Sequence, residues 1–222
     1  MAVAQALYEG LNVGPGGQVG LITYMRTDSV RVADTAIEQS RAYVTSRFGG
    51  DFIPGRPRVY TTRTRGAQEA HEAIRPTVIA RTPEDVRSFL TPEQYRLYDL
   101  IWKRMVASQM ASASMETTTV EVEGHHQPTN NKYLLRASST KVVFPGFQAL
   151  YEEGTDSDED DEDRRPLPEL AKGEGLQSRT VSPLQHFTQP PPRYTDATLI
   201  KALEENGIGR PSTYASILST IQ

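Results

Sequence analysis

Apolar side chains recur at helical spacing through the first half of the chain. Residues three and four apart share one face of a helix, and glycine disfavours helix continuation. Two glycines, at 49 and 50, follow the first of two such apolar patterns. The patterns consist of Ala36, Ile37, Ser40, Tyr43, Val44 and Phe48, and of Leu97, Tyr98, Ile101, Trp102, Met105 and Val106. They predict two amphipathic helices, with Trp102 and the methionines in a core rather than in a ligand site.

Two helix starts are visible from residue types alone. Thr82 and Thr91 each precede a proline and stand three residues before Asp85 or Gln94, which is the pattern of a capped helix with Pro at its first position. Residues 1–9 also indicate a helix. They lack a basic leader and are interrupted by polar side chains, so we expect neither a signal peptide nor a membrane span.

The pattern changes from helical to alternating or β-branched near residue 112. Segments 117–122, 133–137, 141–147 and 175–187 are predicted to be strands. Three prolines in 189–193 then predict an extended linker. A capped helix over 195–203, ending near 206–207, and a second helix starting within 211–216 follow. The chain therefore has an α+β multidomain pattern: a helical module at 1–111, a β-rich module at 112–190 and the start of a helical domain at 191–222.

Charge is distributed unevenly. The net charge is −4, yet residues 152–163 carry nine acidic and no basic side chains, which leaves +5 for the remainder. The acidic segment predicts a solvated loop, and a second interpretation is that it repels or mimics nucleic acid. Elsewhere arginine outnumbers lysine, which suits bidentate phosphate contacts, although most of these arginines are expected to be solvated surface. The chain has no cysteine, so it contains neither disulfides nor thiolate metal sites.

Residues 21–29 (LITYMRTDS) place a tyrosine two positions from an arginine. A phenol has an ordinary pKa of about 10 and costs roughly 4 kcal/mol to ionise at neutral pH, so a nucleophilic tyrosine needs a nearby cation or base. In a strand, Tyr24 and Arg26 would project from one face while Met25 points to the core. The chain has ten tyrosines, and spacing alone does not separate this chemistry from a half-buried ring beside a solvated arginine.

The same segment resembles the active-site motif of the type IA DNA topoisomerases, and Met25 is the variant found in the bacterial topoisomerase I group. Two further segments resemble that family in the same order: 68–76 (QEAHEAIRP) and 207–215 (GIGRPSTYA). The resemblance covers essentially all 222 residues and is weakest near 156–163. It implies a winged-helix-like nucleophile module joined to a β-rich arch module and part of a helical domain where DNA enters.

The resemblance also implies the chemistry. Tyr24 would attack single-stranded DNA, form a 5′-phosphotyrosine and release a 3′-hydroxyl without ATP. Strand passage and religation would then relax negative supercoils. Arg26 would bind the scissile phosphate and stabilise the charge of the transition state.

Supporting roles are implied for residues around these motifs. The imidazolium of His71 would donate a hydrogen bond to the phosphate, Glu72 would orient it, and Arg75 would contact the DNA backbone. Thr27, Asp28 and Ser29 would shape the turn after the nucleophile. At the other end of the chain, Arg210, Ser212 and Thr213 are implied to bind single-stranded DNA where a helix begins. A glycine stop followed by a helix cap is compatible with the same residues.

Magnesium is implied for the intact enzyme, with its ligands in an N-terminal Toprim domain that these 222 residues do not include. The acidic segment offers no fixed octahedral geometry, so we expect no metal in this chain. We therefore expect it to be a fragment that does not relax DNA alone. Its implied partners are single-stranded or negatively supercoiled DNA and the remaining domains of the same enzyme. The implied location is the bacterial cytoplasm with the nucleoid, with no membrane association.

Two other functional classes were compared with these motifs. Tyrosine recombinases need dispersed arginines and a late tyrosine, and relaxases need a histidine cluster that binds metal. His125 and His126 stand in a predicted polar turn far from Tyr24, so neither pattern fits. The alternative that remains is a non-catalytic single-stranded-DNA-binding module in which Tyr24 is structural. An intact enzyme unaffected by Tyr24→Phe would favour that alternative.

Overall fold

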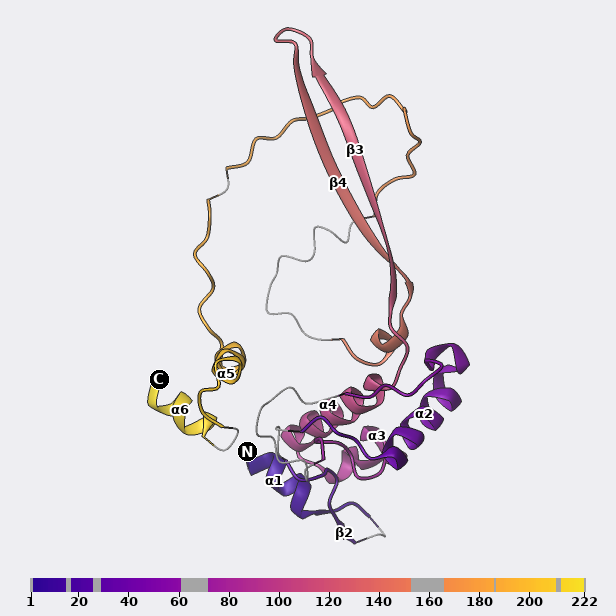
Figure 1. Cartoon of the computed structure of the whole chain (residues 1–222), viewed down its shortest axis with the longest axis vertical. Coiled ribbons are helices and arrows are strands. Elements are labelled where there is room, and N and C mark those ends of the chain that lie inside the picture. The colour runs from indigo at the N-terminus through magenta and orange to yellow at the C-terminus, as the bar shows by residue number, and fades with distance from the viewer. Residues whose placement is uncertain are drawn as a thin grey trace. The chain divides into compact units, whose positions relative to one another are not determined.

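A computed structural model describes residues 2–14, 17–25, 29–60, 72–152, 166–185, 187–210 and 213–221. It divides into two compact units, Met1–Pro168 and Glu169–Gln222, which we describe separately. The first unit has a helical base and a long β-hairpin, and the second contains two helices (Figure 1). None of the helices within these ranges is long and apolar enough to cross a membrane.

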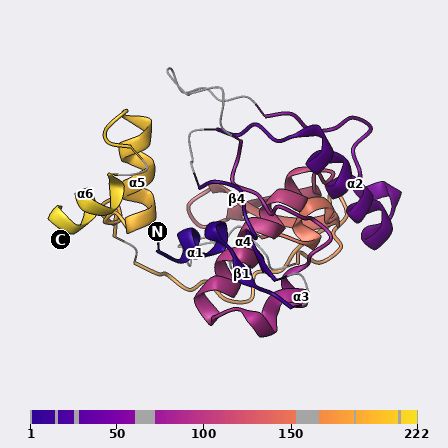
Figure 2. The ribbon, with the colours of Figure 1, turned by 90° about the horizontal axis from the view of Figure 1, so that it is seen from below.

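The helical base confirms the helices predicted from the sequence. Both threonine caps form complete capping boxes, in which Thr82 and Thr91 accept from the backbone N–H three residues on. Viewed from below, α1, α3 and α4 lie close together, and α1 and α3 both pack against α4 (Figure 2). The elements of the base are α1 (Ala2–Glu9), β1 (Leu11–Asn12), β2 (Gln18–Val19), α2 (Asp34–Phe48), η1 (Gly50–Phe52), α3 (Pro83–Val86), η2 (Arg87–Phe89) and α4 (Pro92–Ser108).

Helix α4 forms the centre of the core and uses two aromatic side chains to hold a neighbouring loop. Trp102 is 3% exposed and donates its indole N–H to the carbonyl of Ile79 at 2.9 Å. The hydroxyl of Tyr98 donates to the carbonyl of Arg81 at 2.8 Å, and burial raises the pKa of Tyr98 to about 12. Hydrogen bonds from buried side chains fix backbone that has no regular structure of its own. Helix α4 thereby anchors the loop that follows residues 72–77.

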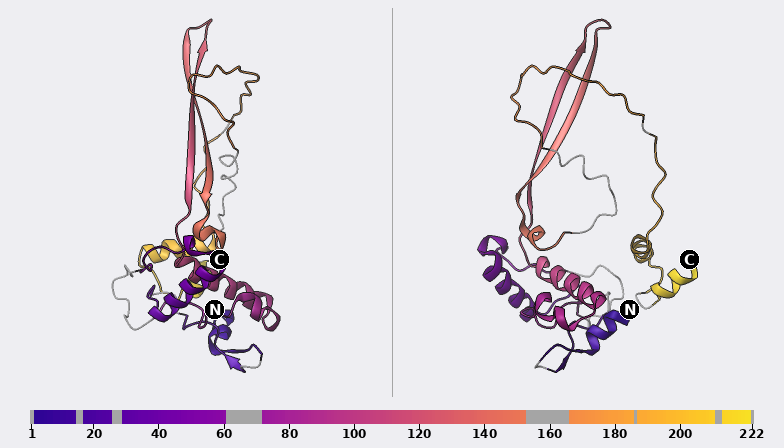
Figure 3. Two further views of the ribbon diagram at one scale, coloured as in Figure 1. Left: turned by 90° about the vertical axis from the view of Figure 1, so that its right-hand side faces the viewer. Right: turned by 180° about the vertical axis from the view of Figure 1, so that it is seen from behind.

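The β-hairpin consists of β3 (Ser114–His126) and β4 (Asn131–Phe144), paired antiparallel. Both views in Figure 3 show the two strands paired along their length and extending away from the helices of the same unit. Its two faces differ. One carries Val120, Val122, Ala137, Leu135 and Tyr133 together with the Thr118–Ser139 pair, and the other carries the Thr117–Thr140 and Thr119–Ser138 pairs, the Glu121–Arg136 ion pair and Leu134. Apolar side chains therefore predominate on one face of the outer half of the hairpin, although neither face is apolar along its whole length.

The root of the hairpin is fixed by a close backbone approach. Gly146 has φ +50°, and a Cβ there would lie 2.5 Å from the backbone of Ser112. The next residue, Phe147, donates its N–H to the carbonyl of Ala111 at 2.9 Å, and the rings of Phe52 and Phe144 lie 4.9 Å apart. Only glycine allows both this φ and this approach. The end of β4, continued by η3 (Gly146–Ala149), is thus tied to the end of α4.

Three strand predictions need correction. No strand forms in the described part of 175–187, where Val181, Leu184 and Phe187 are largely exposed. A strand forms only when its backbone hydrogen-bonds to a second strand. Alternation of apolar and polar residues within one segment does not provide that partner. Segment 141–147 divides between the end of β4 and the start of η3. Near Tyr24, the described residues pair through one isolated bridge, from Ile22 to Pro76, rather than through a full strand.

The second unit contains α5 (Asp196–Glu205) and α6 (Tyr214–Ile221), as predicted. Thr195 caps α5 with a reciprocal capping box. The helix ends at Glu205, Gly207 follows with φ +69°, and the N–H of Ile208 donates back to the carbonyl of Leu203 at 2.8 Å. This is the left-handed C-terminal cap that glycine favours. The predicted stop near 206–207 is therefore confirmed.

Candidate active site

The segment that carries Tyr24 is held by a second segment about fifty residues further along the chain. We call this pair, residues 20–23 and 73–77, the clip. The N–H of Thr23 donates to the carbonyl of Arg75 at 2.9 Å, and the N–H of Thr77 donates to the carbonyl of Leu21 at 3.0 Å. Leu21 and Ile22 are buried, so the clip fixes the position of the backbone against the core and its direction just before Tyr24.

Two threonine hydroxyls reinforce the clip. Thr23 Oγ1 donates to the carbonyl of Ala73 at 2.8 Å and accepts the N–H of Arg75 at 2.9 Å. Thr77 Oγ1 donates to the carbonyl of Gly20 at 2.7 Å. These hydroxyls satisfy backbone groups that an isolated bridge leaves unpaired. The sequence analysis did not assign either threonine to the site, because pairing between distant segments leaves no local pattern.

Glu72 and Arg75 form a bidentate ion pair beside the clip. Arg75 Nε donates to Glu72 Oε1 at 2.7 Å and Nη2 donates to Oε2 at 3.0 Å. Oε1 also accepts the N–H of Ala33, the residue before α2, at 2.8 Å. Ala33 has no side-chain oxygen with which to cap that helix, but the carboxylate of Glu72 satisfies the free N–H of Ala33 and places a negative charge near the positive end of the helix dipole.

These contacts determine the ionisation of Glu72. Burial alone would raise its pKa, but the hydrogen bonds from Arg75 and Ala33 and the positive charge of Arg75 outweigh burial and hold the pKa below its usual 4.5. A lowered pKa in the folded state means that the carboxylate stabilises the fold above about pH 4.5. This contribution is lost as pH falls through the lower folded value.

We expect Glu72→Gln to destabilise the protein by about 1 kcal/mol at pH 7, because it removes charge-assisted bonds to Arg75. The difference in unfolding free energy between wild type and variant should shrink below pH 4.5 and vanish once the wild-type carboxyl is protonated. Urea titrations of both proteins between pH 3 and 7 measure this difference in unfolding free energy. Glu121→Gln is the control, since its pair with Arg136 is exposed on the hairpin. A difference independent of pH would contradict the assigned role of the Glu72 charge.

Tyr24 itself lies at the surface of the base. Its side chain is 48% exposed, and its ring meets the ring of Tyr8 edge-on, with centroids 5.2 Å apart. Tyr8 belongs to α1, whose last turn touches the start of the clip: the N–H of Leu21 donates to the carbonyl of Leu7 at 2.8 Å. A Cβ at Gly20 would lie 2.7 Å from the carbonyl oxygen of Tyr8, so glycine permits this approach. Helix α1 thus positions the phenol from one side.

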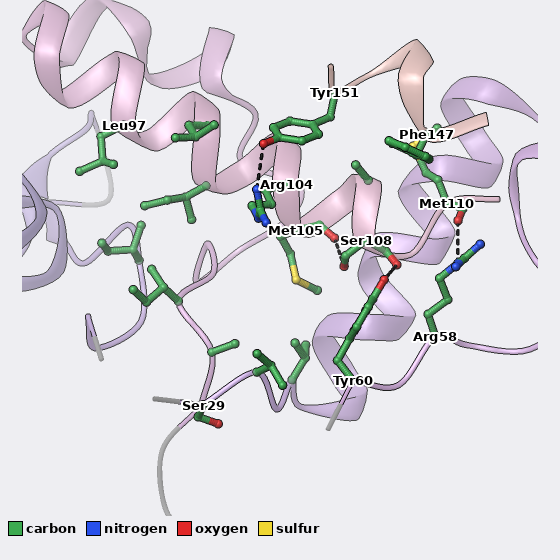
Figure 4. A pocket seen from close by; sticks show the side chains of 18 of the residues that line it. Ser29, Arg58, Tyr60, Leu97, Arg104, Met105, Ser108, Met110, Phe147 and Tyr151 are labelled. Atoms are coloured by element: carbon green, nitrogen blue, oxygen red, sulfur yellow. Dashed lines mark hydrogen bonds between the residues drawn. The ribbon is translucent and has the colours of Figure 1, made fainter. Parts of the chain in front are cut away.

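Beneath the segment that carries Tyr24 lies a cavity of about 660 Å³ (Figure 4). Met25, next to Tyr24, lines it, which agrees with the predicted inward direction of this side chain. Ser29 also lines it, and its hydroxyl accepts the N–H of Arg31 at 3.2 Å. This bond is a local turn contact of the kind predicted for Ser29.

The other predicted site residues divide into three groups. Arg26, Thr27, Asp28, His71 and Ser212 lie outside the described residues. Glu72 and Arg75 lie together beside the clip, with Arg75 also donating to the carbonyl of Pro76 at 2.9 Å. Arg210 and Thr213 belong to the second unit, where the N–H of Arg210 donates to Thr213 Oγ1 at 2.8 Å and the Thr213 hydroxyl bonds back to the Arg210 carbonyl. Their implied roles stay predictions.

Within the described ranges, no group of three or more histidine, aspartate or glutamate side chains is arranged to hold a metal ion. Glu72, the acidic group beside the clip, is already bonded to Arg75 and Ala33. These residues therefore do not fit a metal site, and we assign no chemical step to a metal here.

Comparison with known proteins identifies the family to which this geometry belongs. A family model described as DNA topoisomerase matches residues 1–222. The chain belongs to the DNA topoisomerase family. The DNA topoisomerase 1 proteins of Xylella fastidiosa strains Temecula1 and 9a5c are each 51% identical to it over 223 residues. The structure of full-length topoisomerase I from Thermotoga maritima matches with a TM-score of 0.73 and 34% identity, over 100% of this chain and 33% of that one.

The predicted membership of the type IA topoisomerases, and the similarity to the bacterial enzymes, are confirmed by these relatives. DNA topoisomerases are isomerases, so the prediction that the chain derives from an enzyme is confirmed as well. The alignments include 100% of this chain but only 27% of the length of each Xylella relative. The mixed helical and β architecture predicted from the sequence agrees with the topoisomerase I match.

Proposed function

We propose that this chain carries the nucleophile of a DNA topoisomerase that cuts one DNA strand at a time. The Tyr24 oxygen forms a bond to a backbone phosphorus, and the bond from that phosphorus to the 3′ oxygen breaks. The phenol loses its proton as it attacks and the leaving 3′ oxygen gains one, so the products are a 5′-phosphotyrosine and a 3′-hydroxyl. Because one phosphodiester replaces another, reversal needs no ATP. Passage of a strand through the gap then relaxes negative supercoils.

The observation that carries this proposal is the placement of Tyr24. Its ring is half exposed, while the residue before it, Thr23, is fixed by the clip and the residue after it, Met25, lines the cavity. A nucleophile needs access to substrate and a fixed direction of attack, which together convert binding into reaction. Arg26 and His71, which flank the clip in sequence, are proposed to bind the scissile phosphate and to donate a hydrogen bond to it.

The cleavage assay that tests this proposal uses the complete enzyme, magnesium and a single-stranded oligonucleotide labelled at either end. After denaturation, the 3′-end label should migrate with the protein, and the 5′-end label should appear on a shorter free strand. The opposite pattern would mean attachment at a 3′ phosphate and would exclude the proposed chemistry. Absence of any adduct, with DNA binding retained, would favour the non-catalytic binding module.

The remaining parts of the enzyme are proposed to supply what this chain lacks. Magnesium would be held by a Toprim domain outside these 222 residues, and the 222-residue chain alone would not relax DNA. Magnesium-dependent relaxation by the purified chain would contradict this. We place the enzyme in the bacterial cytoplasm, with single-stranded or negatively supercoiled DNA as its partner.

We further propose that Arg210 binds a DNA phosphate, with Ser212 and Thr213 beside it at the start of α6. Arg210→Ala should weaken binding of single-stranded DNA by about tenfold at low salt. It should also lower the slope of log affinity against log salt by about 0.7, since one phosphate contact is lost. Fluorescence anisotropy with oligonucleotides of several sequences measures both.

The matched control for Arg210 is Arg193→Ala, another exposed arginine of the second unit, outside the 207–215 motif. A phosphate contact carries no base information, so all sequences should be affected equally. If Arg193→Ala and Arg210→Ala reduce affinity to the same extent, general positive charge and not a phosphate site explains the binding.

A further inference from the structure

The cavity beneath the nucleophile segment is mainly apolar. Helix α4 forms one wall, α1 contributes Ala4, and the clip contributes Ile22 and Ile74. Its volume, about 660 Å³, is of the size that binds an organic ligand or several large side chains. The α4 residues that line it are Leu97, Leu100, Ile101, Arg104, Met105, Ala107 and Ser108.

Several large apolar side chains of this lining remain exposed to water. Leu100 is 48% exposed, Tyr60 45% and Val30 40%. Clustered exposed apolar surface of this kind marks a surface that another partner covers, whereas single exposed residues need no explanation. Leu100 lies on a different face of α4 from the buried Tyr98, Trp102 and Met105, so the core of the base does not cover it.

The polar groups around the cavity are bonded to one another. Arg104 Nη1 donates to the hydroxyl of Tyr151 at 2.9 Å, and Arg58 Nε donates to the carbonyl of Met110 at 3.1 Å. The Tyr60 hydroxyl donates to the carbonyl of Ser108 at 2.9 Å. Figure 4 shows these three bonds at the rim. A nucleotide or phosphate would compete with them, whereas apolar side chains would leave them intact.

We infer that this cavity is filled by the apolar face of a helix from polypeptide outside these 222 residues, in the same protein. The chain covers 27% of its Xylella relatives and 33% of the Thermotoga protein, so most of each relative's length is available to supply it. Helices α1 and α4 already pack against each other at one wall, and a third helix can lie beside them with its side chains between those of α4. The docked helix would support Met25 from below.

The test uses the complete enzyme with Leu100→Cys. Because the 222 residues contain no cysteine, the new thiol is unique among them, and its peptide is identified by mass spectrometry. Arg96→Cys is the matched control, since Arg96 is exposed on the same helix and does not line the cavity. Maleimide should modify Leu100→Cys at least tenfold more slowly than Arg96→Cys. A benzophenone maleimide attached at position 100 under forcing conditions should cross-link to a peptide outside residues 1–222.

Three results would overturn the inference. Equal maleimide rates at positions 96 and 100 would mean that the cavity is open in the complete enzyme. A cross-link within residues 1–222 would mean that the chain fills its own cavity. A cross-link between isotopically distinct copies would assign the surface to an interface between protomers. Leu97→Cys, at a second lining position, repeats the measurement if Leu100→Cys does not fold.

Discussion

Replacing Tyr24 with phenylalanine in the complete enzyme should abolish the covalent DNA adduct and DNA relaxation. We expect a loss of at least about a thousandfold, because no other group replaces a covalent nucleophile. The ring that meets Tyr8 is retained, and half of the side chain is already in solvent, so folding should be unaffected. Binding of single-stranded DNA should change by less than threefold, since the phenol oxygen is proposed to react rather than to bind. Gel analysis of the trapped adduct and anisotropy of DNA binding measure the two effects separately.

The control is Tyr8→Phe, which removes the other hydroxyl of the same aromatic pair. Both rings are partly exposed, at 39% for Tyr8 and 48% for Tyr24. The control enzyme should form adduct at close to the wild-type rate. If Tyr8→Phe abolished the adduct and Tyr24→Phe did not, the nucleophile would be assigned to the wrong member of the pair. If neither did, a different nucleophile would be required.

Replacing Thr23 with valine should impair both stability and activity while leaving the phenol in place. Valine has the shape of threonine but loses a hydroxyl that donates to Ala73 and accepts from Arg75. Two partly buried backbone groups are left without partners, which costs about 2 kcal/mol of unfolding free energy. The clip then holds Tyr24 less firmly, and misplacement of a reacting group by about 1 Å lowers its rate by roughly a hundredfold. Single-turnover adduct formation and urea unfolding of the complete enzyme measure these two losses.

Thr45→Val tests whether these losses are specific to the clip. The Thr45 hydroxyl bonds only within α2, to the carbonyl of Arg41, and the residue is exposed. We expect a change of less than about 0.5 kcal/mol and no loss of adduct formation. Equal effects of Thr23→Val and Thr45→Val would show that the clip does not position the nucleophile.

Local chemistry made the helices predictable. Thr91 with Pro92 and Gln94 specifies a start within four residues, and Gly207 specifies a stop through its own φ, so neither depends on distant parts of the chain. The amphipathic face of α4 was equally clear, and Trp102 was correctly assigned to the core. Two of the predicted strands, 117–122 and 133–137, lie within β3 and β4, which extend further, but their pairing into one hairpin was not predicted.

Pairing between distant segments was not predictable in the same way. The sequence at 175–185 alternates like a strand but has no pairing partner among the described residues, whereas Ile22 and Pro76 pair without a strand pattern on both sides. At the candidate site, the motifs pointed to Tyr24, Glu72 and Arg75. They did not reveal that Glu72 caps α2, because that contact depends on the tertiary approach of residues 39 positions apart.

The long sequence separation across the clip has a consequence for the order of folding. Thr23 and Arg75 are 52 positions apart, and their bonds can form only after the chain between them has closed into a loop. Helix α2 lies inside that loop and is stabilised by contacts within its own turns, so it can form early and shorten the distance to be closed. We therefore expect Tyr24 to be among the last groups to reach its native position during folding. On gradual denaturation it should be among the first to leave that position, with α4 still in place.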